Sequence, residues 1–106
     1  MKVLNRSYLQ ITPKLAFWEL VKTKSEDSSF MDFHEPSIYL IKEDFWDETE
    51  LLNTYWKKIS HFEFEQILES SSEDLIPNSL EEFKGLFTYN IGGTVVDCIK
   101  EAPERL

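Results

Sequence analysis

The sequence predicts a single α+β domain over residues 1–106, with a small antiparallel or mixed sheet of about three strands and three to four helices packed mainly on one face. Three stretches predict this fold. Residues 5–21 change from strand to helix periodicity within one residue, residues 37–42 form a continuous apolar run, and residues 48–68 repeat apolar side chains at helical spacing. The predicted order is β-α-β-α-(α)-α-β, which is typical of helices layered on a sheet.

The first predicted strand, residues 6–11, runs directly into the first helix. Thr12 is a predicted N-cap, because its hydroxyl can accept a hydrogen bond from an amide of the first turn. Pro13 then becomes the first helical residue, where a missing N–H costs nothing and the fixed φ suits the helix. Because one cap residue separates the two elements, we expect the helix to fold straight back across the sheet.

The middle of the chain predicts a strand and a long helix. Residues 37–42, SIYLIK, are rich in β-formers and lack alternation, which indicates a central strand or one covered on both faces. Asp44 or Asp47 can then cap a helix. Its apolar stripe slips in phase near Ser60 and His61, where we expect a bend or a second short helix. The stripe consists of Leu51, Leu52, Tyr55, Trp56, Ile59 and Phe62.

The last third of the chain predicts a short helix and a final strand. Ser79 and Glu82 have the spacing of a capping box, so a helix begins there, and we expect it to end before Asn90. The pair Gly92–Gly93 predicts a flexible or positive-φ turn. Residues 94–100 alternate as a strand does, and we expect the lone cysteine in it, Cys98, to be a buried and inert thiol.

Short motifs along nearly the whole chain resemble a family of small uncharacterised bacterial proteins. The pattern begins with N-R-S at residues 5–7 and T-P-K-x-x-F at residues 12–17. It continues with a Y-L-I strand within residues 38–41 and ends with a V-x-D strand that includes Val96–Asp97. The chain departs from the pattern at Ala16, Leu20, Lys42 and Leu86. No activity is attached to this family, so the resemblance implies the fold and leaves the function open.

The chain is acidic: twenty Asp and Glu residues against eleven Lys and Arg residues give a net charge of −9. This charge opposes phosphate backbones and anionic lipids, so we expect no binding to nucleic acid and no binding to membranes. No apolar stretch approaches the roughly 20 residues of a membrane span, and no signal peptide is visible, which predicts a cytoplasmic protein. The charge either keeps the protein dispersed by self-repulsion or forms an acidic face for a basic partner.

Catalytic motifs are absent from the sequence. It contains no P-loop, no G-x-S-x-G and no G-x-G-x-x-G, and a lone cysteine excludes an internal disulfide and a Cys-rich zinc site. We therefore expect a protein that is not an enzyme, with no catalytic residues, no cofactor and no metal.

A few residues have the chemistry for an alternative function. His61 could act as a general base, although pairing with a nearby Glu on a wet helix face is the simpler interpretation. Cys98 could act as a nucleophile if the fold brought a histidine beside it. The loop cluster of Asp32, His34 and Glu35 could supply metal ligands, although a solvated loop is the ordinary interpretation.

The aromatic group of Phe45, Trp46, Tyr55 and Trp56 is the candidate partner surface, because Trp and Tyr concentrate binding energy in interfaces. Its alternative role is in the core, since Tyr55 or Trp56 must belong to the helix stripe. The predicted function is protein–protein contact with a basic partner, as an adaptor, inhibitor or immunity-type protein. The alternative is a small enzyme or ligand-binding domain that uses His61, Cys98 or the Asp32–His34 loop.

Overall fold

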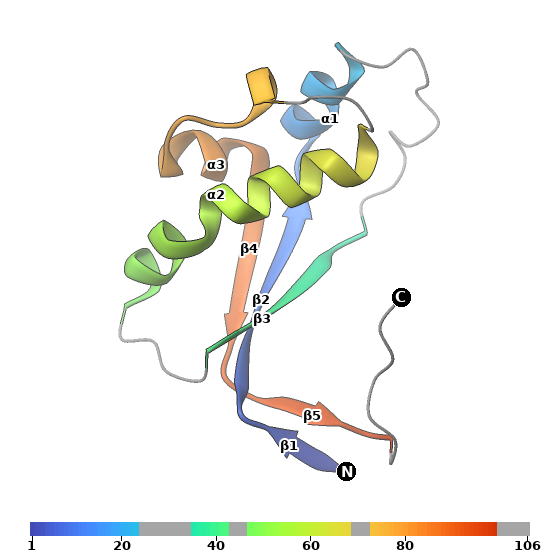
Figure 1. Ribbon diagram of the computed structural model, residues 1–106, viewed down its shortest axis with the longest axis vertical. Helices are drawn as coiled ribbons and strands as arrows, with labels where there is room; N and C mark the ends of the chain where they lie inside the picture. The colour runs from blue at the N-terminus through green and yellow to red at the C-terminus, as the bar shows by residue number, and fades with distance from the viewer. Residues whose placement is uncertain (24–34, 43–46, 69–72, 100–106) are drawn as a thin grey trace.

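The computed structural model describes residues 1–23, 35–42, 47–68 and 73–99, and it confirms the α+β architecture. The strands β3, β2 and β4 form one antiparallel sheet in that order, and β1 and β5 form a second, two-stranded antiparallel sheet. Helices α1, α2 and α3 gather at the end of the larger sheet where β2 ends, and the smaller sheet lies at the opposite end (Figure 1). The elements in chain order are β1 (Lys2–Leu4), β2 (Arg6–Pro13), α1 (Leu15–Lys22), β3 (Ser37–Lys42), α2 (Glu48–Ile67), the 3₁₀ turn η2 (Glu73–Leu75), α3 (Leu80–Leu86), β4 (Phe87–Gly92) and β5 (Val95–Asp97).

The helices cover one face of the three-stranded sheet. Along β2, buried side chains alternate with half-buried ones, as a strand with one covered face requires. Leu9, at the centre of β2, pairs with Tyr39 of β3 and Ile91 of β4, so these three side chains share the covered face. On the open face, Tyr8 lies between Leu40 and Gly92.

A cluster of aromatic rings fills the space between the sheet and the helices. The ring of Phe17 in α1 lies with its centroid 5.0 Å from that of Trp18, 4.7 Å from that of Phe64 in α2 and 5.1 Å from that of Phe87 in β4. Phe83 of α3 extends the cluster through Phe87. Each such pair contributes about 0.5–1.5 kcal/mol beyond the area it buries. The cluster therefore joins every helix to the sheet.

The predicted direct transition from strand to helix is confirmed, but the predicted cap is wrong. Thr12 and Pro13 continue β2, because they pair with Thr88 and Phe87 of β4. Helix α1 begins at Leu15, after Lys14 as an N-cap without a side-chain cap bond. Strand β2 is two residues longer than the local sequence predicts, because β4 provides partners for Thr12 and Pro13.

The strand at Ser37–Lys42 has the predicted bounds but not the predicted place in the sheet. It is an edge strand, and Ile38 and Leu40 are more than half exposed. Asp47 caps α2 as predicted, with its Oδ1 accepting a hydrogen bond from the Thr49 amide at 2.7 Å.

Helix α2 continues through Ser60 without a break, so the predicted second short helix is wrong. The buried Ser60 hydroxyl donates to the Trp56 carbonyl oxygen at 2.7 Å, so the helix accommodates a polar residue on its core-facing stripe. The apolar pattern of α2 slips in phase near Ser60 only because this buried position of the helix holds a polar residue.

The C-terminal third differs most from the prediction. Ser79 caps α3 as expected, accepting from the Glu82 amide at 3.2 Å. The helix then ends at Leu86, and the residues expected to finish the helix and form a turn are strand β4. The final strand β5 has three residues, and Cys98 beyond it is exposed, so the predicted buried thiol is wrong.

A glycine is needed at position 92 because a neighbouring side chain leaves no room for a Cβ there, and not because of the backbone angles. No glycine in the described part of the chain has positive φ, so the positive-φ form of the turn predicted at Gly92–Gly93 is wrong. A Cβ on Gly92 would lie 2.1 Å from Cε1 of Tyr8, its partner across β2 and β4. The Tyr8 ring therefore packs directly over the bare glycine backbone, as aromatic rings do beside glycines in sheets. Gly93 has nothing within 4 Å of such a Cβ.

We expect Gly92→Ala to lower the free energy of unfolding by about 1–3 kcal/mol, because the added methyl displaces the Tyr8 ring. Urea unfolding measures the loss, and Gly93→Ala is the matched control that should leave stability nearly unchanged. In the double variant Tyr8→Ala/Gly92→Ala the glycine substitution should cost much less, because the clash is gone. Equal losses for Gly92→Ala and Gly93→Ala would contradict the contact.

Candidate functional site

A buried carboxylate joins α2 to β3. Glu63 of α2 is only 5% exposed, and its Oε2 accepts hydrogen bonds from the Ser37 hydroxyl at 2.9 Å and from the Tyr39 hydroxyl at 2.5 Å. Glu63 lies one helical turn from Ile59 and Ile67, on the side of α2 that faces the sheet. Ser37 and Tyr39 are two residues apart in β3, so both point to the covered face. The two hydroxyls offset part of the large cost of burying a charge.

The environment of Tyr39 keeps its hydroxyl protonated. Burial raises the pKa of Tyr39 far above its usual value, and the hydrogen bond to Glu63 and the negative charge of that residue raise this pKa further. At neutral pH the Tyr39 hydroxyl therefore keeps its proton and donates it to Oε2 of Glu63.

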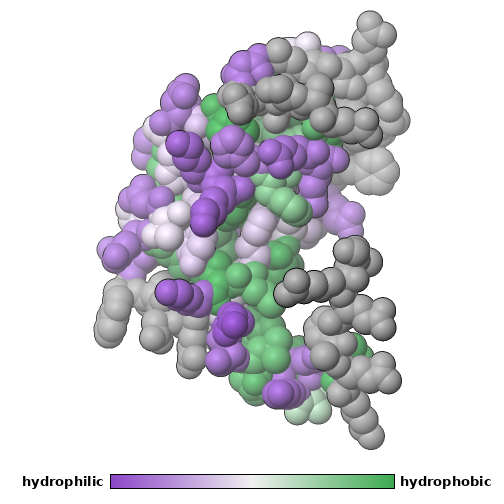
Figure 2. Space-filling view, viewed as in Figure 1, coloured by the Kyte–Doolittle hydropathy of each residue, from purple (hydrophilic) through white to green (hydrophobic). Residues whose placement is uncertain are grey.

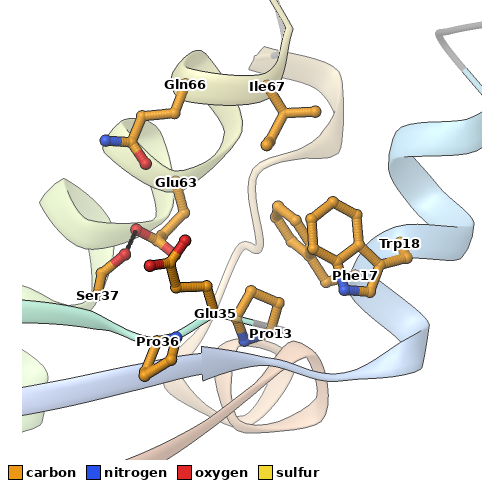
Figure 3. A pocket seen from close by; sticks show the side chains of 9 residues that line it. All are labelled: Pro13, Phe17, Trp18, Glu35, Pro36, Ser37, Glu63, Gln66 and Ile67. Carbon is orange, nitrogen blue, oxygen red and sulfur yellow. Dashed lines mark hydrogen bonds between the residues drawn. The ribbon is translucent and has the colours of Figure 1, made fainter. Parts of the chain in front are cut away.

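A cavity of about 340 Å³ opens beside this carboxylate, and we call it the Glu63 cavity. Figure 3 shows Phe17 and Trp18 of α1 on one side of it and Glu63 with Ser37 on the other. Its volume lies at the lower end of the range of about 300–1,000 Å³ that is usual for ligand pockets. The residues that line it are Pro13, Phe17, Trp18, Glu35, Pro36, Ser37, Glu63, Gln66 and Ile67.

A second hollow of about 620 Å³ runs between β3 and α2, and we call it the β3–α2 groove. Phe62 lies at this groove about half exposed, with its ring edge-to-face against Tyr39 at 6.0 Å. Both hollows are lined by Ser37 and Gln66, so they adjoin. The groove is lined by Ser37, Ile38, Tyr39, Leu40, Ile41, Tyr55, Lys58, Ile59, Phe62 and Gln66.

The surface around these hollows is unevenly polar. Figure 2 shows a mostly hydrophilic outer face along α2, with hydrophobic side chains exposed below it along the larger sheet. Ile38, Leu40 and Phe62 belong to the large apolar residues that are exposed in the described part of the chain.

The structure brings only part of the predicted surface to this region. Tyr55 lines the β3–α2 groove, whereas Trp56 packs partly buried against the core. Phe45 and Trp46 lie outside the described residues, so the four-residue aromatic surface stays a prediction.

Those residues of the alternative function that the structure describes are not brought together. His61 is half-buried on α2 and lines neither hollow, and Cys98 lies exposed beyond β5. Asp32 and His34 lie outside the described residues, whereas Glu35 lines the Glu63 cavity. Within the described residues, no group of three or more His, Cys, Asp or Glu side chains could hold a metal ion.

Sequence reasoning missed Ser37, Tyr39 and Glu63. One signal was available, because Glu63 stands on the apolar stripe of α2, four residues after Ile59 and four before Ile67. An acidic residue at such a position is buried only when polar partners meet it. Those partners come from β3, 24 and 26 residues earlier in the chain.

We expect Tyr39→Phe to lower the free energy of unfolding at pH 7 by about 1–3 kcal/mol, because the buried carboxylate loses a donor. The folded pKa of Tyr39 lies above the unfolded one, so this contribution is complete below about pH 10 and is lost as the pH rises beyond it. The difference between the wild type and Tyr39→Phe should therefore shrink above pH 10.

Urea unfolding at pH 7.0 and pH 10.5 measures this difference. Ser37→Ala is the matched control: it removes the other donor to Glu63 but no titrating phenol, so its cost should not fall in the same way. A Tyr39→Phe cost that is the same at both pH values would contradict the assignment.

Comparisons of the chain with models of protein families, with curated proteins and with solved structures found no match. The resemblance to small bacterial proteins therefore stays a prediction from the motifs. No helix in the described part of the chain is long and apolar enough to cross a membrane.

Proposed function

We propose that the protein is a binding module for a protein partner, which adds an extended segment to the outer edge of β3 and places apolar side chains in the β3–α2 groove. The observation that carries this proposal is an edge strand with exposed apolar residues directly beside an apolar groove. Strand addition of this kind combines main-chain hydrogen bonds with pockets for alternate side chains.

The backbone of β3 has capacity for another strand. In an antiparallel pair, alternate residues direct their N–H and C=O groups toward the partner strand, and the others direct them away. Within the described residues, β3 pairs with β2 alone, so half of its backbone groups point to the outer edge.

Apolar side chains flank this edge on both faces of the sheet. Ile38 and Leu40 lie on the open face and also border the β3–α2 groove. Tyr39, Ile59 and Phe62 line the groove on the covered face. An added strand points its side chains alternately to the two faces, so both sets would meet apolar surface. A partner segment with alternating apolar residues fits this edge.

Charge favours a basic partner, in keeping with the prediction from composition. The chain has a net charge of −9, and Glu35 and Glu63 line the cavity that adjoins the groove. Lys58 is the one charged residue among the described residues that line the groove, so apolar contacts govern docking there. Electrostatic complementarity then contributes mainly to the association rate and to specificity.

A photo-cross-linking amino acid at position 40 identifies the partner in the native cell. The same amino acid at position 96 is the control, because Val96 is also an exposed apolar residue but lies in β5 of the smaller sheet. A protein that is captured from position 40 and not from position 96, and that then binds directly when purified, supports the proposal. Capture of the same protein from both positions would contradict it.

We expect Phe62→Glu to weaken binding of that purified partner about tenfold or more, because loss of a central aromatic ring from an interface costs at least about 1–2 kcal/mol. Calorimetric titration measures the affinity. Val96→Glu introduces the same charge at a comparably exposed apolar site and should leave the affinity within about twofold. Similar losses for both variants would show that the net charge, and not the groove, determines binding.

A further inference from the structure

The Glu63 cavity combines a dehydrated carboxylate with apolar walls. Both hydroxyl donors, Ser37 and Tyr39, share Oε2 of Glu63, and no hydrogen bond from the described residues reaches Oε1, which can therefore meet a ligand. The charged residues among the described residues that line the cavity are Glu35 and Glu63, and both are acidic. When no cation lies beside a buried carboxylate, much of the free energy that it costs to remove the carboxylate from water is not recovered. The cavity is therefore complementary to a positively charged group.

The walls restrict what can carry that charge. Phe17, Trp18 and Ile67, together with two prolines, present mostly apolar surface to the cavity. Such a surface suits an aliphatic chain, and aromatic rings attract a nearby cation through their electron-rich faces. An anion would be repelled by both carboxylates, and a purely apolar ligand would leave Glu63 dehydrated and without a new partner.

We infer that the Glu63 cavity binds a short alkyl chain that ends in an ammonium or guanidinium group, with the cationic group against Glu63 and the chain against Phe17 and Trp18. This inference rests on the proposed function in one respect: a Lys or Arg side chain of the docked partner is one source of such a group. A free alkylamine or alkylguanidine is the other source. The cavity adjoins the β3–α2 groove at Ser37 and Gln66, so a docked segment lies within reach of it.

Titration of the protein with butylguanidinium and butylammonium tests the site without any partner. Two-dimensional NMR follows the indole signal of Trp18, assigned with a Trp18→Phe variant, and n-butanol is the uncharged control ligand. We expect a saturable shift with the two cations and none with butanol at the same concentrations. No saturable shift with either cation would overturn the inference.

Two matched variants test the role of the buried charge. Glu63→Gln keeps the size and the acceptor oxygen but removes the charge, and it should weaken cation binding about tenfold or more. Glu65→Gln makes the same change at an exposed position of α2 that does not line the cavity, and it should leave the affinity within about twofold. Equal effects of the two variants would overturn the inference.

A third variant keeps Glu63, so it tests the site even if Glu63→Gln fails to fold. Gln66→Lys places an ammonium group at the cavity from an exposed helix position, so it should abolish cation binding and raise the midpoint of urea unfolding. Gln66→Met is the neutral control of similar size, and it should retain binding. Undiminished binding to Gln66→Lys would overturn the inference.

A peptide comparison then separates the two sources of the cation. An extended peptide with one arginine between valines binds more tightly than butylguanidinium if a partner supplies the group, and Leu40→Lys lowers the affinity of the peptide alone. Equal affinities assign the site to a free small cation. Binding of butylguanidinium with no strand docking would support this inference while contradicting the proposed function, so the two can fail separately.

Discussion

The ring of Phe17 is the contact on which the arrangement of the helices depends. It is fully buried and touches aromatic rings from α1, α2 and β4, and through Phe87 it reaches α3. Because these rings interlock, the distance between α1 and α2 is set by the size of the side chains between them. The same ring also forms one wall of the Glu63 cavity, so the core determines the width of the site.

A polar contact complements this apolar one on the same turn of α2. Glu63 and Phe64 are consecutive residues, and they are both buried, one against β3 and the other in the aromatic cluster. The apolar contact is tolerant of small rotations of the helix, whereas two hydrogen bonds to one oxygen are directional. The hydroxyls of Ser37 and Tyr39 therefore define how α2 is oriented over the strand.

The end of β2 is held by contacts that are remote in sequence. The Lys14 amide donates to the Leu86 carbonyl oxygen at 2.8 Å, and the Lys14 ammonium group donates to the Lys84 carbonyl oxygen at 2.8 Å. These bonds use carbonyl groups at the end of α3, which a helix leaves without internal partners. The start of α1 is thereby tied to the end of α3, which explains how α1 begins without a side-chain cap.

The sequence correctly predicted the features that depend only on residues close together in the chain. The caps at Asp47 and Ser79 and the bounds of β3 follow from a few neighbouring residues, and the structure confirms them. Strand β4 was missed because its six residues become a strand only by pairing with β2, which is far away in the chain. The same pairing explains why Pro13 ends a strand instead of beginning a helix. The site was missed for a similar reason, since nothing near Glu63 in the sequence shows which hydroxyls meet it.

The outer edge of β3, which pairs with no strand among the described residues, has a cost at high protein concentration. Residues 37–41, SIYLI, are uncharged and rich in β-formers, a composition that promotes cross-β aggregation when such an edge is exposed. Pro36 stands immediately before this segment and Lys42 immediately after it, and proline and lysine are the residues that commonly act as gatekeepers beside aggregation-prone strands. Mutual repulsion between chains that each carry −9 opposes edge-to-edge contact, and salt screens it over a distance of about 8 Å at physiological ionic strength. The colloidal stability of this protein is therefore coupled to the ionic strength of its surroundings.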